Sequence, residues 1–125
     1  MYQYSFEKLE VWQLSRELVK EIYRVTSSFP IEEQFGLTRQ LRRASISISS
    51  NLAEGSSRKS WKDQAHFTQM SYGSLMEVLN QLIISVDLEM INKNDLDDLR
   101  PKIEMIGNKL NSFRNSQLTR TDKKS

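Results

Sequence analysis

The chain has 125 residues, of which 38% are hydrophobic and 27% are charged, and its formal net charge is +2. This length suits one domain that buries its own core. The absence of cysteine and the presence of one histidine exclude a disulfide framework, a thiolate metal site and a site with several histidine ligands. No apolar run approaches the roughly 20 residues of a membrane span, and no signal-peptide pattern is present. We therefore expect a cytoplasmic protein without a membrane partner.

Apolar residues recur with the period of a helix in four separate segments. From these stripes and the turn residues between them, we expect helices near residues 6–28, 38–55, 60–90 and 95–113. Only 4 glycines and 2 prolines are present, which is typical of long helices. Amphipathic helices with short connections predict an all-α, antiparallel up-down four-helix bundle.

The first of these segments carries two apolar stripes. The main stripe is Val11, Ser15, Leu18, Ile22, Val25 and Phe29. Trp12, Val19 and Tyr23 form a second stripe beside it. Such a wide face predicts that this helix contacts more than one neighbour. Pro30 then ends the helix, because proline disfavours helical geometry in the residue before it.

The second segment allows two interpretations. Residues 44–49 alternate apolar and polar side chains, as a half-buried strand would. We favour a helix because a strand would have no partner strand. Thr38 is the expected N-cap, and Gly55 is suited to a left-handed position at the C-terminal end. Ile46 and Ala53 then lie off the main apolar stripe, which suggests a second contact surface.

Ser60 is the expected N-cap of the third and longest helix. Gly73, in the middle of this helix, is expected to permit close approach of a neighbouring helix. Pro101 is expected to kink the fourth helix or to mark a loosely formed first turn. The apolar period disappears beyond Asn115, so we expect a bundle over residues 1–115 and a disordered basic tail over 116–125. The centres of the stripes are the predicted core: Leu18, Ile22, Leu41, Ile48, Leu75, Leu79, Leu82, Ile103, Ile106 and Leu110.

The sequence gives little support for catalysis. His66 is the single histidine, and it lies in no metalloprotease or nucleophile motif, so we interpret it as a surface or boundary residue. Glu54 and Glu77 are the candidates for carboxylates that face the inside of the bundle. The Glu-x-x-His pairs of carboxylate-bridged metal sites are absent. We predict no catalytic residue, no metal site and no cofactor.

Positive charge is concentrated on the second predicted helix and the turn after it. Residues 37–62 contain 6 basic side chains and 1 acidic side chain. The basic residues are the candidate nucleic-acid-binding residues: Arg39, Arg42, Arg43, Arg58, Lys59 and Lys62. On a helix, four polar residues of this segment would line one strip: Arg43, Ser47, Ser50 and Glu54. Gln40 and Asn51 would lie at the edge of this strip. The strip either holds phosphates or is a solvated face, or it joins Arg43 to Glu54 at a subunit contact.

Segments 9–13, 29–37, 40–55 and 72–77 together resemble the bacterial family of 23S rRNA intervening-sequence proteins, a family of four-helix bundles. The resemblance covers about residues 6–113, and its most specific part is the run from Arg42 to Gly55. The residues that carry it are Gln40, Arg43, Asn51, Glu54, Gly55, Gly73 and Glu77.

Members of this family resemble the accessory variability protein of diversity-generating retroelements, a pentameric barrel that binds nucleic acid and a reverse transcriptase. The resemblance implies a homo-oligomer, with five subunits as the expected number, and it implies RNA, DNA or a protein such as a reverse transcriptase as partners. Two functional hypotheses stay open. One is a non-enzymatic oligomer that binds nucleic acid through a basic surface without sequence specificity. The other is a purely structural or adaptor oligomer that binds a protein partner.

Overall fold

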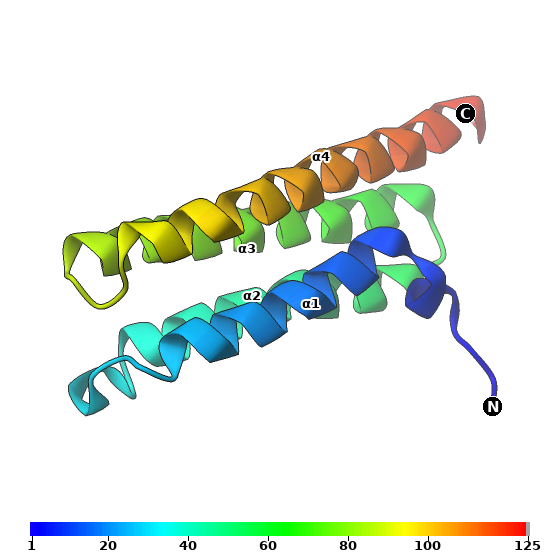
Figure 1. Ribbon diagram of the computed structural model, residues 1–125. Helices are drawn as coiled ribbons and strands as arrows, with labels where there is room; N and C mark the ends of the chain where they lie inside the picture. Colours follow the sequence, from blue (N-terminus) through cyan, green and yellow to red (C-terminus); the bar gives the residue numbers. More distant parts are fainter. Residues whose placement is uncertain (125) are drawn as a thin grey trace.

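The computed structural model describes the backbone of residues 1–124 and the side chains of residues 1–120. Every regular element in this part of the chain is helical (Figure 1). The elements are η1 (Ser5–Lys8), α1 (Glu10–Thr26), η2 (Ile31–Glu33), α2 (Leu37–Ser56), α3 (Trp61–Asp87) and α4 (Lys93–Lys124), where η marks a short 3-10 helix. The predicted all-α class is confirmed. None of the helices described is long and apolar enough to cross a membrane.

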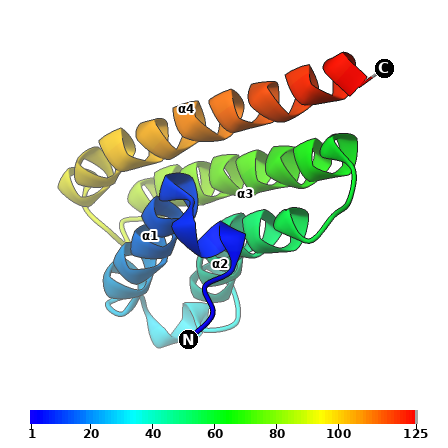
Figure 2. The ribbon, with the colours of Figure 1, turned by 90° about the vertical axis from the view of Figure 1, so that its right-hand side faces the viewer.

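The four long helices run alternately up and down. The α1–α2 and α3–α4 connections lie at one end of the molecule, and the α2–α3 connection lies at the other end with both chain termini (Figures 1 and 2). Contacts between α2 and α3 and between α3 and α4 are the most extensive, and α1 packs mainly on α2. The architecture is the predicted antiparallel four-helix bundle.

One apolar core runs through the bundle. Of the ten predicted core residues, all are buried except Leu79, which is half-buried at the edge of the buried face of α3. Val78 is fully buried in its place. The prediction for Leu79 was wrong because the second row of the buried face of α3 lies on the other side of Leu75 and Leu82, at Ser71, Val78 and Ser85, and leaves Leu79 at its edge. Ser71, Leu75, Val78 and Leu82 occupy the buried face at spacings of three and four.

Residues 44–49 are helical within α2, so the strand alternative is excluded. The helix begins at Leu37, where the backbone N–H donates to the Glu33 carboxylate over 3.1 Å, and not at an N-cap formed by Thr38. Gly55 has a negative φ and lies inside α2, contrary to the left-handed position predicted for it. It is needed for close packing, because a Cβ atom there would lie 2.8 Å from Cβ of Phe67.

The start of α3 matches the prediction, since the Ser60 hydroxyl accepts a hydrogen bond of 3.1 Å from the Asp63 N–H. The predicted role of Gly73 is wrong, because this residue is exposed and a Cβ atom there would meet nothing within 4 Å. Beyond the end of α3, Glu89 adopts a left-handed conformation with φ 60°. Its neighbour Met90 closes the helix end by donating its N–H to the Ser85 carbonyl over 2.9 Å.

The fourth helix differs most from its prediction. It continues through Pro101 and extends to Lys124, which is beyond the expected end near residue 113. Gln117 is buried at 3% exposure, and its side chain accepts a hydrogen bond of 2.8 Å from Thr68 on α3. The tail predicted over 116–125 is therefore helical as far as Lys124, and residue 125 lies outside the described residues. Polar side chains pack this last part of α4 against α3, so the period of the apolar residues did not predict that the helix continues.

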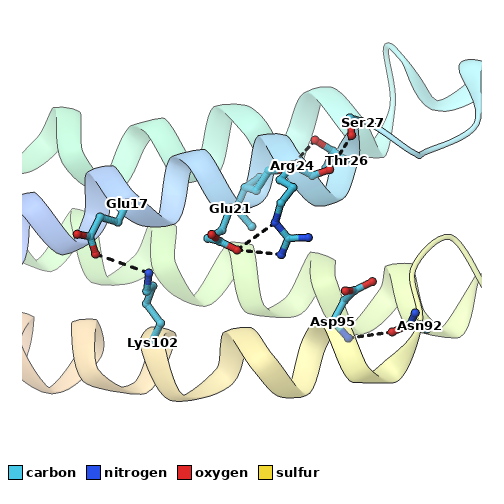
Figure 3. A network of polar contacts seen from close by, with 9 residues as sticks. Glu17, Glu21, Arg24, Thr26, Ser27, Asn92, Asp95 and Lys102 are labelled. Carbon is cyan, nitrogen blue, oxygen red and sulfur yellow. Dashed lines mark hydrogen bonds and ion pairs between the residues drawn. The ribbon is translucent and has the colours of Figure 1, made fainter.

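Charged side chains join α1 to α4 along the outside of the bundle. Glu17 lies 3.6 Å from Lys102 and Glu10 lies 3.3 Å from Lys109, measured between carboxylate oxygen and ammonium nitrogen; the first pair is visible in Figure 3. Figure 3 also shows Glu21 beside Arg24 on α1 at 2.9 Å, and the hydrogen bond and negative charge of Glu21 raise the pKa of Arg24. These pairs are exposed, so each contributes little stability.

Candidate nucleic-acid interface

The structure separates the six predicted basic residues into two groups at opposite ends of α2. Arg39, Arg42 and Arg43 lie in the first two turns of the helix, whereas Arg58, Lys59 and Lys62 follow its C-terminal end. From Arg39 to the end of α2 at Ser56 the helix rises about 26 Å, at about 1.5 Å per residue. One chain therefore presents two basic regions and not one continuous patch.

Arg42 has a structural role in the first group. Its Nε donates to the Thr26 hydroxyl over 2.9 Å, and its guanidinium lies 4.4 Å from the centroid of the Tyr23 ring. Both partners belong to α1, so Arg42 ties α2 to α1. This use of the guanidinium leaves Arg42 a weaker candidate for a phosphate contact than its neighbours.

Arg39 and Arg43 are exposed, and neither forms an ion pair with a described residue. They border an open pocket of about 330 Å³ at the α1–α2 end of the bundle, which we call the arginine pocket. Its lining is Tyr23, Gln34, Phe35, Thr38, Arg39, Arg42, Arg43 and Ile46. Phe35 in this pocket is 78% exposed, which is high for a phenylalanine.

The second group lies at the α2–α3 turn, where Lys59 and Lys62 are exposed. Arg58 is partly engaged: its guanidinium lies 3.3 Å from the Glu54 carboxylate and 4.6 Å from the centre of the Phe67 ring. Within one chain, Glu54 therefore pairs with Arg58. This pair neutralises part of the positive charge of the turn.

Two arginines of α4, which are not among the six predicted residues, extend this second basic region. Arg120 lies 4.6 Å over the ring of Trp61, at the first residue of α3. Arg114 shares a surface pocket of about 210 Å³ with Lys62 and His66 of α3. Residues 107–125 contain 5 basic residues and 1 acidic residue, which is a signal for these arginines in the sequence, although Arg120 falls in the segment that was expected to be disordered. We call the whole region the end cluster, which consists of Arg58, Lys59, Lys62, Arg114 and Arg120.

The predicted polar strip is mostly exposed at Arg43, Ser50 and Glu54, and it contacts α3 at Ser47. The Asn51 amide donates to the Ser47 carbonyl over 2.9 Å, and the Ser74 hydroxyl of α3 donates to Ser47 Oγ over 2.9 Å. Gln40 accepts a long contact of 3.4 Å from the buried Gln81. Ser47 and Asn51 are therefore half-buried; Ser47 joins α2 to α3, whereas Asn51 bonds within α2, and these contacts make both weaker candidates for phosphate binding.

Glu54 and Glu77 are exposed, which contradicts an inward placement of these carboxylates. Across the described side chains, no group of three or more histidine, cysteine or acidic residues could hold a metal ion. His66 is exposed on α3, and its ring lies edge-on to Phe67 with centroids 6.0 Å apart. It borders the end cluster and has no hydroxyl or thiol nucleophile among the contacts described for it.

The fold and the surface define a class of small helical bundles with basic ends. Residues 7–112 match the family of 23S rRNA-intervening sequence proteins, and the chain belongs to this family. It is also similar to a crystal structure of a protein of unknown function from the S23 ribosomal protein family of Bacteroides thetaiotaomicron. The TM-score is 0.58 at 19% sequence identity, over 89% of this chain and 97% of that one. At this identity the likeness concerns the fold alone. No protein with a curated description matches the chain.

Proposed function

We propose that this protein is a non-enzymatic homo-oligomer that binds RNA or DNA through the end cluster without sequence specificity. The observation that carries the proposal is the convergence of cations from two separate segments, the α2–α3 turn and the C-terminal half of α4, at one end of the bundle. Lys59 on the turn and Lys62 at the start of α3 are exposed, and the nearby acidic groups are Glu54, which is paired with Arg58, and Asp63.

The chemistry of the end cluster suits phosphates and not bases. Lysine and arginine contact phosphate oxygens by charge and hydrogen bonds, which gives affinity and position without reading sequence. A single set of such contacts binds weakly at physiological salt. An oligomer repeats the set once per subunit, and the repeated contacts add through effective concentration. Assembly is therefore part of the proposed mechanism of binding.

Exposed apolar side chains on α3 support assembly. Met70, Met76, Ile83 and Ile84 are each 37–38% exposed, and Ile46 on α2 is 41% exposed. Met76 and Ile83 are one seven-residue repeat apart, and Met70 and Ile84 are two such repeats apart, so these side chains follow faces that run along the helix. Such faces mark contacts with another protein surface. We propose that they join copies of this chain, with five subunits as the number implied by the family resemblance.

The test of nucleic-acid binding compares two triple variants in which the same amount of charge is removed. In the first, Arg58, Lys59 and Lys62 are replaced with Ala. In the control, the exposed residues Lys20, Lys93 and Arg100 are replaced with Ala. Binding of labelled duplex DNA and RNA is measured by anisotropy at several salt concentrations, after light scattering shows that each variant keeps the mass of the wild type.

We expect the first variant to bind more weakly and with a shallower salt dependence. The logarithmic slope on duplex DNA should fall by about 0.9 for each phosphate that the variant no longer neutralises. The control should retain the wild-type slope. Equal weakening in both variants would mean that net charge alone is responsible, and the end cluster would then be the wrong site. A wild-type protein that binds no nucleic acid at low salt would contradict the proposal and favour the structural or adaptor oligomer.

A further inference from the structure

The arginine pocket lies at the end of the bundle opposite to the end cluster, and phosphate binding at that cluster does not account for it. Its lining combines three arginines with the rings of Tyr23 and Phe35 and contains no acidic residue. Tyr23 is covered by the guanidinium of Arg42, whereas Phe35 is 78% exposed. The pocket therefore offers one free aromatic face between cations.

The acidic residues nearest in sequence to the arginines of the pocket, Glu32 and Glu33, form no ion pair with them. Glu33 on η2 accepts the Leu37 N–H over 3.1 Å and so is used at the start of α2. Glu32 is exposed on the same short helix and is not part of the lining. Arg39 and Arg43 have no ion-pair partner among the described residues. An anionic ligand in the pocket would therefore meet two guanidinium groups that no described side chain neutralises.

We infer that the arginine pocket binds single-stranded nucleic acid, with one base stacked on Phe35 and the adjacent phosphates contacted by Arg39 and Arg43. A nucleotide brings both features that the lining requires, since it joins a flat apolar face to an anionic group. Aromatic platforms beside basic side chains bind single strands by this combination, because every base has a face that can stack. A duplex keeps its base faces inside the helix, so it can use the arginines but not Phe35.

Other occupants fit the lining less well. An acidic peptide would pair with the arginines but would leave the Phe35 ring in water unless it also carried an aromatic side chain. A second copy of this chain would have to present acidic groups to Arg39 and Arg43 and an apolar group to Phe35. The inference rests on the proposed function in one respect, namely that the protein binds nucleic acid at all.

The experiment uses the full chain and three single variants. Phe35→Ala removes the stacking platform, and Phe35→Trp restores an aromatic face. Ile31→Ala is the matched control, because Ile31 is 74% exposed on η2 and does not line the pocket. Fluorescence anisotropy measures the Kd for a short labelled single strand of RNA, for the matching duplex, and for an abasic strand of the same length. Light scattering records the mass of each variant.

We expect Phe35→Ala to weaken single-strand binding about 5- to 150-fold, the range associated with stacking of one base on an aromatic side chain. Duplex and abasic binding should change less than about twofold, since phosphate contacts remain. Phe35→Trp should bind the single strand at least as well as the wild type, and Ile31→Ala should behave as the wild type. An additional Arg39→Ala, Arg43→Ala double variant should weaken binding of all three ligands.

Four results would overturn the inference. Equal weakening on the single strand and on the duplex would show that Phe35 does not contact a base. A change of mass in Phe35→Ala would place Phe35 between copies of the chain. Unchanged single-strand binding by Phe35→Ala, while replacement of Arg58, Lys59 and Lys62 weakens duplex binding, would leave the proposed function standing and remove the arginine pocket from it. If the wild type binds none of the ligands, the proposed function fails and the inference fails with it.

Discussion

Thr68 on α3 and Gln117 on α4 are joined by a buried hydrogen bond, in which the threonine hydroxyl donates to the glutamine carbonyl over 2.8 Å. The exposed fractions of these residues are 2% and 3%. They are separated by 49 positions in the chain, and the bond holds the last part of α4 against the start of α3. Arg114 and Arg120 lie on either side of Gln117, so the same contact positions the α4 half of the end cluster.

Replacement of Gln117 with Ala should reduce the free energy of unfolding by about 0.5–1.5 kcal/mol, because it removes a buried hydrogen bond while the Thr68 hydroxyl keeps the Gln64 carbonyl as an acceptor at 3.1 Å. Urea denaturation followed by circular dichroism measures the change. Ser116→Ala is the control, since Ser116 is exposed on the neighbouring position of the same helix. If both variants are as stable as the wild type, the last turns of α4 do not contribute to the folded domain.

Leu82 and Leu79 should respond differently to the same truncation. Leu82 is fully buried, whereas Leu79 is half-buried beside a surface pocket lined by Tyr72 and Ile103. Leu82→Ala should cost about 2–5 kcal/mol of stability. Leu79→Ala should cost less, since its removal opens a site that water can already reach. An equal decrease for the two variants, measured by urea denaturation, would contradict the assignment of the buried face of α3.

Arg42 and Arg43 are adjacent in sequence but should have separable roles. Arg42→Ala removes the hydrogen bond to Thr26 and the contact with Tyr23, so it should reduce stability by about 1–2 kcal/mol. Arg43→Ala should leave the free energy of unfolding within about 0.5 kcal/mol of the wild type, as for most exposed positions. Thermal unfolding of the two variants in parallel checks this. Greater destabilisation by Arg43→Ala would mean that the structural arginine has been misassigned.

Glu89 is the one described non-glycine residue with a positive φ, at 60°. A left-handed conformation costs a residue with a Cβ atom roughly 1–2 kcal/mol, and glycine avoids that cost while it loses more entropy on folding. We expect Glu89→Gly to stabilise the protein by about 0.5–1 kcal/mol, as measured by urea denaturation. Glu77→Gly, in the exposed interior of α3, should instead destabilise it by about 1 kcal/mol. Destabilisation by both substitutions would show that Glu89 makes contacts that outweigh its backbone conformation.

The exposed apolar residues of α3 provide a test of assembly. Ile84→Glu places a charge among them, so the mass measured by light scattering should fall from an oligomer toward the 14.7 kDa of one chain. Ile31→Glu makes the same substitution at an exposed position outside α3 and should leave the mass unchanged. A wild-type mass of one chain at micromolar concentration would rule out the proposed oligomer.

Local sequence pattern determined most of the bundle. Apolar residues at helical spacing identified four helices, and the helical interpretation of residues 44–49 was correct because the flanking stripe of α2 outweighed the short alternation. The Ser60 cap and nine of the ten predicted core residues follow from the same kind of local signal, in which side-chain type and spacing suffice.

Tertiary structure decided the features that depend on a partner distant in the chain. Gln117 is buried because α3 offers it Thr68, and a polar residue gives no apolar period from which that helix could have been predicted. Arg42 became structural and Arg43 stayed exposed because only the first faces Tyr23 and Thr26 of α1. The end cluster likewise depends on α4 returning to the α2–α3 turn. Sequence determines the apolar period and the charge of each helix. Packing in three dimensions determines which charged side chains contact another helix and which stay exposed to bind a ligand.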